Sequence, residues 1–384
     1  MKRASYSQGT VARYGCRYLC AVLAWIRGDK ILWVVAFILS VLGLLVVYSA
    51  TVGLVFRYHP EMPEYYLAKQ ALTILVAFFL AYSVHLMDYR RWGPLFELFW
   101  VGSVALLLYV FLRGGGAQRW LYVGGISLQP SELARFSLLG VLAYRMAADP
   151  ERLCSWQGLF PLLVRIGITF ALIAPLNLSN GLSLLMLSAL FLYIGGMPLR
   201  HLMRLGLVGL AGVGVLFLVA PRAQVWRARL EAYWQKSPLR TQAADDYQRA
   251  HASLAVYSGG FFGKGPGRST QRYYLPQSYS DFAFSILIEE YGLLGGIVVL
   301  SLYGLFLWRL ASIATLTQGF AQLLVIAAFL QVAWQVLVHV GVSLELLPIT
   351  GVPLPWVSLG GSSLLVQALI LGLSTAISQK ALHG

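Results

Sequence analysis

The stretch from residue 275 to residue 292, LPQSYSDFAFSILIEEYG, carries the chain from a polar loop into an apolar helix. Asp281 stands at that junction, and Glu289 and Glu290 follow about two turns deeper in the expected helix. A carboxylate beside an apolar segment is costly to desolvate and needs a reason to be present. Two compatible interpretations of Asp281 are a cap for the helix start and a general base.

Composition places this junction in a membrane protein. Hydrophobic residues make up 58% of the 384 positions and charged residues 11%, whereas a soluble domain carries about 25% charged residues. A formal net charge of +14 in so apolar a chain is poorly explained by a nucleic-acid partner. Because about 20 apolar residues cross a bilayer, we predict an all-α polytopic membrane protein with ten transmembrane helices, near residues 31–56, 68–86, 95–112, 131–147, 159–176, 182–196, 202–220, 283–308, 320–340 and 362–379.

The distribution of basic residues predicts the orientation. Residues 1–30 form a basic tail, and Lys and Arg recur in the even-numbered loops and at the C-terminus. The positive-inside rule therefore predicts that both termini are cytoplasmic. Residues 31–384 then form one membrane domain, in which segment 221–282 is a large extracytoplasmic loop between helices seven and eight. This loop is basic and aromatic, which suits an interfacial segment that binds anionic headgroups.

Further polar residues accompany Asp281. Paired acids inside a span usually face the bundle interior, so pairing with a buried Arg is favoured for Glu289 and Glu290 over direct chemistry. The glycine-rich run 259–269 lacks the spacing of a nucleotide-binding loop. Its cations, Lys264 and Arg268, could still meet a phosphate.

A second constellation lies at residues 117–135. Ser131 and Glu132 after Pro130 are an ordinary helix start. That reading leaves Arg119 beside Trp120 unexplained, and also Arg135 one turn into a span. The two arginines are interpreted as cations that bind a polar or anionic ligand at the outer leaflet.

A third constellation is the run LPITGVPLPWVSLGGSS at residues 347–363. Its three prolines exclude a regular helix and predict a rigid, re-entrant segment. Ser358, Ser362 and Ser363 could be nucleophiles, but close helix packing by small residues is the favoured explanation. His339 is expected to be a buried hydrogen-bonding residue.

Taken together, the three segments resemble the SEDS family (shape, elongation, division and sporulation), over nearly the whole chain. The family patterns A-x-R-W…Q-P-S-E, L-P-E-x-x-T-D-F-x-F…E-E-x-G and P-x-T-G-x-P-L-P-x-x-S-x-G-G-S-S match residues 117–132, 275–292 and 348–363. The loop at 263–276 and the basic tail resemble the FtsW type more than the RodA type. Departures from the family pattern are Gln277, Ser280, Arg135, Leu359 and the segment 175–181, which lacks an acid.

The resemblance implies a peptidoglycan glycosyltransferase that polymerises lipid II at the outer face of the cytoplasmic (inner) membrane during cell division. The 4-hydroxyl of the acceptor sugar would attack C1 of the donor with inversion, and undecaprenyl pyrophosphate would leave. Asp281 matches the family's essential acid. Binding of substrate would fall to Arg119, Trp120, Glu132, Arg135, Lys264, Arg268, Arg272, Ser358 and Ser362, with Glu289 and Glu290 in secondary, structural roles.

Cofactors and partners are expected on the same basis. The sequence shows no dedicated metal cage, although a divalent cation, Mg²⁺ or Mn²⁺, could help to neutralise the diphosphate. The implied partners are a single-span class B penicillin-binding transpeptidase of the FtsI type and other divisome proteins, at the division septum.

Three alternatives remain open. The chain could be a lipid II flippase, a non-catalytic divisome scaffold, or a RodA-type elongation polymerase. A flippase should line a path across several helices with polar groups. Charges in the middle of the spans are few here, and this favours chemistry at the membrane surface.

Overall fold

The computed structural model describes residues 28–52, 64–113, 120–123, 126–219, 224 and 243–383. Each of the ten predicted spans corresponds to a helix, although several boundaries move by a few residues. The helices are α2 (Lys30–Ala50), α4 (Tyr65–His85), α5 (Trp92–Arg113), α6 (Pro130–Ala148), α7 (Trp156–Ile173), α8 (Leu178–Ile194), α9 (Leu199–Val219), α12 (Ala283–Thr315), α13 (Gly319–Ser343) and α14 (Gly361–His383).

Seven of these helices are long and apolar enough to cross a membrane, counted over the described residues: α2, α4, α5 (extended to Tyr89), α7, α12, α13 and α14. Of the other three, α8 is apolar but only 17 residues long. Charged residues lower the hydropathy of α6, which carries Glu132, Arg135 and Arg145. The fold is that of a multi-pass membrane protein, and the count of ten crossings stays a prediction.

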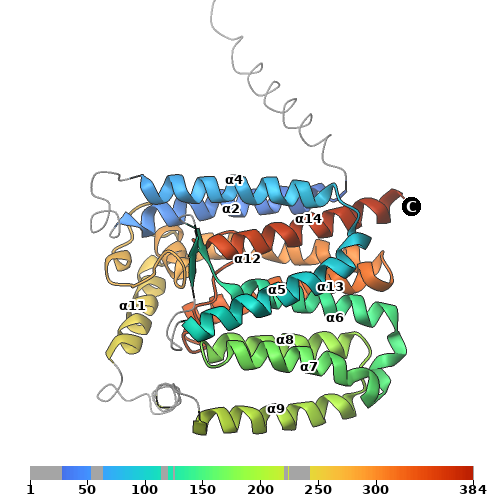
Figure 1. Cartoon of the computed structure of the whole chain (residues 1–384). Coiled ribbons are helices and arrows are strands. Elements are labelled where there is room, and N and C mark those ends of the chain that lie inside the picture. The colour runs from blue at the N-terminus through green and yellow to red at the C-terminus, as the bar shows by residue number, and fades with distance from the viewer. Residues whose placement is uncertain are drawn as a thin grey trace, which may run out of the picture.

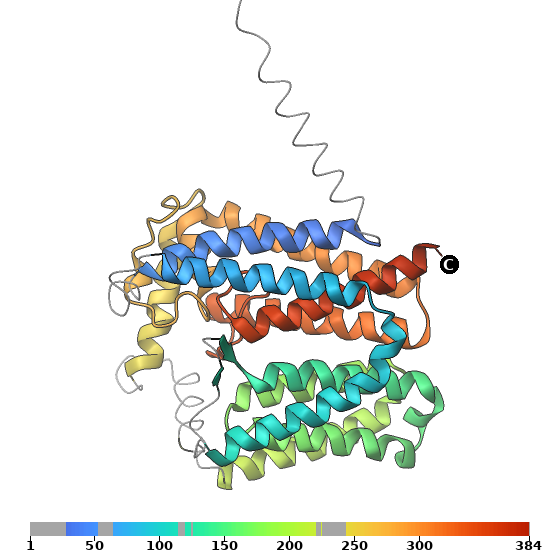
Figure 2. The same ribbon diagram turned by 45° about the horizontal axis from the view of Figure 1, so that its top comes forward.

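The long helices lie side by side in a bundle (Figures 1 and 2). Within it α4 packs on α14, α5 on α6, and α12 on α13. We call the end where α2 begins and α14 finishes the terminal end. At the opposite end, the loop end, α11 (Ala243–Gly259) runs across the bundle (Figure 1).

An ion pair and hydrogen bonds link three helices at the terminal end. Asp29 caps α2 by accepting hydrogen bonds from the backbone N–H groups of Ile31 and Leu32. The same carboxylate pairs with Arg309 of α12 at 2.5 Å, while its own N–H donates to Ser378 of α14. Three helices distant in sequence are therefore fixed at one point.

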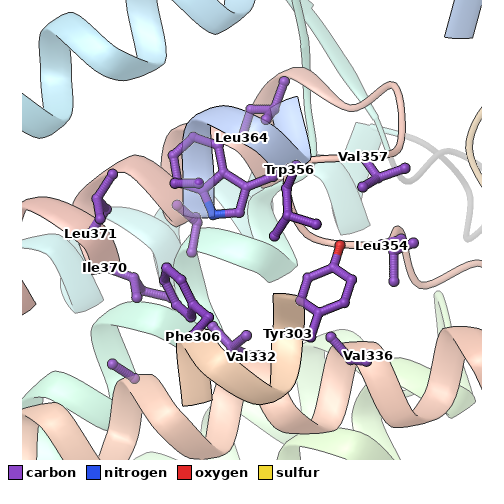
Figure 3. Close-up of a cluster of buried hydrophobic side chains, with 14 of the residues drawn as sticks. Tyr303, Phe306, Val332, Val336, Leu354, Trp356, Val357, Leu364, Ile370 and Leu371 are labelled. Atoms are coloured by element: carbon purple, nitrogen blue, oxygen red, sulfur yellow. The ribbon is translucent and has the colours of Figure 1, made fainter. Parts of the chain in front are cut away.

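The core at the loop end is built around residues 352–358, which are buried and non-helical. Trp356 is 2% exposed, and it lies with Tyr303 and Phe306 of α12 in one apolar cluster (Figure 3). The Tyr303 hydroxyl donates to the carbonyl of Pro355. The prediction that the proline segment, residues 347–360, is not a regular helix is confirmed, and its buried backbone lies within protein, where such a structure is tolerated. Its rigid, re-entrant character stays a prediction.

Two features were not expected. The predicted loop 221–282 contains α11 and a short 3₁₀ helix, η3 (Gln271–Tyr273). Helix α11 forms because Ala252 and Ala255, one turn apart and fully buried, let it lie close to α12. Residues 121–128 also contain a small antiparallel hairpin, β1 (Leu121–Val123) with β2 (Ile126–Leu128), in an otherwise helical fold.

Candidate active site

Asp281 lies at the loop end, two residues before α12 begins at Ala283. A turn precedes it, in which the backbone N–H groups of Ser280 and Asp281 both donate to the carbonyl of Gln277 at 3.0 Å. The N-cap position of α12 is Phe282, so the interpretation of Asp281 as the cap residue was wrong by one position. Its carboxylate accepts a hydrogen bond from the Ser280 hydroxyl at 3.0 Å and is partly exposed.

Hydrogen bonds from the proline segment hold this turn in place. The Ser358 hydroxyl donates to the Ser280 carbonyl at 2.7 Å and accepts from the N–H of Leu354 at 2.9 Å. The Leu359 N–H donates to the Tyr279 carbonyl. Because Ser358 is buried and bonded on both sides, its geometry suits support of the loop rather than nucleophilic attack.

Gly351 of the third motif lies beside the acid. It has a φ of +69°, and a Cβ atom built there would lie 3.4 Å from Oδ2 of Asp281. The two motifs that the sequence separates by 70 residues therefore meet at the carboxylate. A side chain at position 351 would be strained and would crowd the acid.

Glu132 and Arg135 lie deeper than expected. Both are 1% exposed, and they approach each other at 3.4 Å between Oε1 and Nη2. Gln335 donates to Oε2 of Glu132 at 3.1 Å, and Gln367 donates to Gln335 at 2.6 Å. These side chains form a polar network between α6, α13 and α14 instead of an exposed cationic surface.

The network is incompletely bonded. Both terminal nitrogens of Arg135 and Oε1 of Glu132 are buried and have no hydrogen-bond partner among the described residues. Ser362, which the motifs also singled out, accepts a hydrogen bond from the N–H of Gln129 at 3.1 Å. It thereby ties the start of α14 to the residue that precedes α6.

Glu289 accepts several hydrogen bonds from the glycine-rich loop and the residues that follow it, and we call this carboxylate and its partners the Glu289 hub. Its side chain is fully buried, and it pairs with Lys264 at 2.5 Å. It also accepts from the backbone N–H groups of Thr270 and Gln271, at 3.0 and 3.2 Å, and from the hydroxyl of Ser269. The partner is a lysine from the neighbouring loop where a buried arginine was expected, and the arrangement supports a structural role.

A break in α12 makes room for that loop. At Gly292, φ is +71° and the helix is interrupted. The N–H groups of Leu293 and Leu294 donate to the carbonyls of Gly260 and Phe261, while the carbonyls of Glu289 and Glu290 accept from Lys264 and Gly265. The loop thus replaces hydrogen bonds that an unbroken helix would make within itself.

Glu290 and Arg272 share Ser49 of α2. The Ser49 hydroxyl donates to Oε1 of Glu290, and Arg272 donates to Ser49 Oγ at 2.9 Å. The Arg272 guanidinium also lies 4.9 Å from the ring of Tyr273. Ser49 was missed by sequence reasoning because a lone serine in an apolar helix carries no distinctive signal.

The remaining predicted residues are spread more widely. Arg268 is exposed on the loop, and Trp120 is 36% exposed just before β1. Arg119 lies outside the described residues. His339 accepts from the N–H of Phe284 and contacts the Val352 carbonyl at 2.8 Å, as expected for a buried hydrogen-bonding residue. Gln335 and Gln367 were also missed, although polar side chains inside apolar spans are a recognisable signal.

The fold and this site define a class: multi-pass membrane proteins in which motifs at one end of the bundle meet at one acid. A family model described as "Cell cycle protein", for FtsW, RodA and SpoVE, matches residues 29–383. The chain belongs to this family.

Two relatives have similar lengths. The "Probable peptidoglycan glycosyltransferase FtsW" of Geobacter sp. (strain M18) is 31% identical over 92% of this chain and 97% of its own. "Stage V sporulation protein E" of Bacillus subtilis (strain 168) is 30% identical over 91% of this chain and 97% of its own.

Solved structures agree in fold. A chain from "Structural coordination of polymerization and crosslinking by a peptidoglycan synthase complex" has a TM-score of 0.72 at 25% identity, covering 94% of this chain and all of that one. The rod shape determining protein RodA of Thermus thermophilus has a TM-score of 0.64 at 26% identity, covering 93% of this chain and 98% of that one.

Proposed function

We propose that this protein is a peptidoglycan glycosyltransferase of the FtsW type, which polymerises lipid II at the outer face of the cytoplasmic membrane. Family membership and the names of the relatives support the activity. The observation that carries the proposal is the convergence of two motifs on the Asp281 carboxylate, at the end of the bundle opposite the terminal end.

In the proposed reaction Asp281 acts as general base. It takes the proton from the 4-hydroxyl of the acceptor sugar while that oxygen attacks C1 of the donor, and the configuration at C1 inverts. Undecaprenyl pyrophosphate leaves with the bonding electron pair. Proton transfer by a positioned carboxylate accelerates such a step by about 10²–10⁴-fold.

Cations stabilise the leaving diphosphate in this proposal. Lys264, Arg268 and Arg272 lie on the loop 264–272, which the Glu289 hub holds against α12. Fixed positive charges act best where negative charge develops during the reaction. The buried Arg135 would reach the substrate only if the bundle opened between α6 and α13.

A divalent cation could assist. Among the described residues no group of three His, Cys, Asp or Glu side chains is arranged to hold a metal. Mg²⁺ commonly needs only one or two protein carboxylates together with substrate phosphates. Asp281 suits such partial ligation, and the ion would supply charge neutralisation.

The proposal includes a partner and a location. A single-span class B transpeptidase is supported by the solved complex, which joins polymerization to crosslinking. Action at the septum with other divisome proteins follows the FtsW type of the relatives. Cytoplasmic termini follow from the basic residues at the terminal end, which include Arg90, Arg91, Arg309 and Lys380.

The test supplies the purified protein and its transpeptidase with fluorescent lipid II in liposomes. Formation of glycan chains supports the proposal. If lipid II moves between the leaflets and no polymer forms, the protein is a flippase and the proposal is wrong. If neither activity is detected, the protein is a non-catalytic scaffold.

A further inference from the structure

A second charged cluster lies in the wall of the bundle, away from Asp281. The Nε of Arg145 on α6 donates to Glu97 of α5 at 2.6 Å, and Arg165 of α7 approaches the other oxygen of that carboxylate at 3.4 Å. Two guanidinium groups therefore share one carboxylate. We call Glu97, Arg145 and Arg165 the α5–α7 triad, and its formal charge is +1.

This triad lies within the apolar helices and towards the terminal end. Arg165 comes nine residues after Trp156 begins α7, so it is about 13 Å along the axis at 1.5 Å per residue. Arg145, by contrast, lies in the last turn of α6, so the three charged groups meet near the terminal end of the bundle. Charged side chains on apolar helices are costly and usually mark a functional site. The side chains of Arg145, Glu97 and Arg165 are 39%, 24% and 21% exposed, so each reaches the surface of the bundle.

Neighbouring groups fix Arg165 in place. Its guanidinium lies 5.5 Å from the ring of Trp100, whose indole N–H donates to Thr169 at 3.0 Å. Its Nη1 donates to the Pro161 carbonyl. The Nε is buried without a hydrogen-bond partner among the described residues. These contacts hold the guanidinium at the partly exposed edge of the triad.

We propose that the α5–α7 triad binds the phosphate group of an anionic phospholipid. The residual positive charge needs a counter-charge, and guanidinium groups recognise phosphate oxygens with paired donors. Basic sites between transmembrane helices are known to take lipid headgroups. Exposed apolar residues on the same helices, Leu98 and Val101 of α5 and Phe160 and Val164 of α7, offer a surface for the acyl chains.

The test measures lipid binding to the full-length protein in non-ionic detergent by native mass spectrometry. Dioleoylphosphatidylglycerol, dioleoylphosphatidylcholine and inorganic phosphate are the three probes. We expect retention of phosphatidylglycerol over phosphatidylcholine, because only the former carries a net negative charge. Arg145→Gln and Arg165→Gln should each weaken that preference about fivefold. Glu97→Gln should strengthen it, because it raises the charge of the triad.

Two controls keep the outcome interpretable. Arg204→Gln removes an exposed charge from α9 and should change nothing. Arg165→Lys keeps the charge but loses the paired donors, so its binding should fall between the wild type and Arg165→Gln, which separates loss of charge from misfolding. Equal retention of the two lipids, or unchanged binding in both glutamine variants, would overturn the proposal. Displacement of the lipid by equimolar phosphate would assign the site to free phosphate instead.

Discussion

The Glu289 carboxylate joins a helix inside the bundle to the loop that carries the proposed diphosphate-binding cations. Its contacts with Lys264, Thr270 and Gln271 come from both side chains and backbone. A buried charge with this many partners is hard to replace, because its removal leaves several groups unsatisfied at once.

Replacing Glu289 with alanine should therefore destabilise the protein by about 3–5 kcal/mol, because Lys264 and the donors of Ser269, Thr270 and Gln271 lose one buried acceptor together. Glu289→Gln keeps a hydrogen-bond acceptor and should cost less. Thermal unfolding in detergent measures both variants against Glu151→Gln, which alters an exposed acid in the short 3₁₀ helix η2 (Pro150–Cys154). Equal melting temperatures for all three would show that the hub is unimportant.

A variant of Ser358 can distinguish a structural role, in which the residue supports the loop, from a role as nucleophile. Ser358→Ala removes the bonds to Ser280 and Leu354 and should cost about 1–3 kcal/mol, because buried polar groups lose their partner. Polymerisation of lipid II should fall but persist. Ser312→Ala, on the surface of α12, is the matched control. Complete loss of activity in a fully folded Ser358→Ala protein would favour the nucleophile.

At the level of elements, the break in α12 explains why the motif at 289–292 ends in glycine. A Cβ on Gly292 would come within 2.5 Å of the carbonyl carbon of Phe261, and one on Gly263 within 2.5 Å of the Gly292 nitrogen. Both glycines also have positive φ values. Two backbones can cross here only because neither residue carries a side chain.

Gly292→Ala should push the loop 259–272 away from α12. We expect a lower melting temperature, faster tryptic cleavage at Lys264, Arg268 and Arg272, and reduced polymerisation. Gly304→Ala in the same helix has nothing within 4 Å of the new Cβ and should stabilise by up to about 1 kcal/mol. Identical proteolysis of the two variants would contradict the proposed crossing.

Most of the helices were predictable because seven of them are apolar runs of membrane length, which is a local property of the sequence. The proline segment was predictable for the same reason, since proline excludes regular helix wherever it lies. The crossing at Gly292 was not, because it depends on backbone hydrogen bonds between residues 25 to 33 positions apart. Likewise, Lys264 as partner of Glu289 and the burial of Arg135 depend on tertiary packing.

Of the candidate site, the position of Asp281 beside the third motif could be expected only from the family resemblance. Spacing does not reveal that Ser358 bonds to Ser280, because 78 residues separate them. The polar network of Gln335 and Gln367 carried a local signal that was overlooked. Ser49 carried none.

For the whole molecule, contacts at the terminal end hold distant helices together. Lys380 pairs with Asp88 at 2.6 Å, and this hydrogen bond lowers the pKa of Asp88 below its ordinary value of 3.8. A carboxyl with a lowered pKa contributes stability above its unfolded pKa and loses it as the pH falls through the folded value. The pair is well exposed, so its contribution is small.

Wild-type protein should accordingly melt slightly above Asp88→Asn at pH 7. The difference should begin to shrink as the pH falls through 3.8 and should vanish only below the lowered pKa of the folded state. It should also shrink in high salt, because exposed pairs are screened. Melting curves of both proteins across this pH range in one detergent provide the measurement. A difference that grows as the pH falls would have the wrong sign.

The most direct test of the account is the rate at which Asp281→Asn polymerises lipid II, with substrate binding measured in the same preparation. A general base predicts that binding is kept while the rate falls about 10²–10⁴-fold. Glu151→Gln should match the wild type. If Asp281→Asn polymerises at the wild-type rate, the carboxylate at the loop end is not the base.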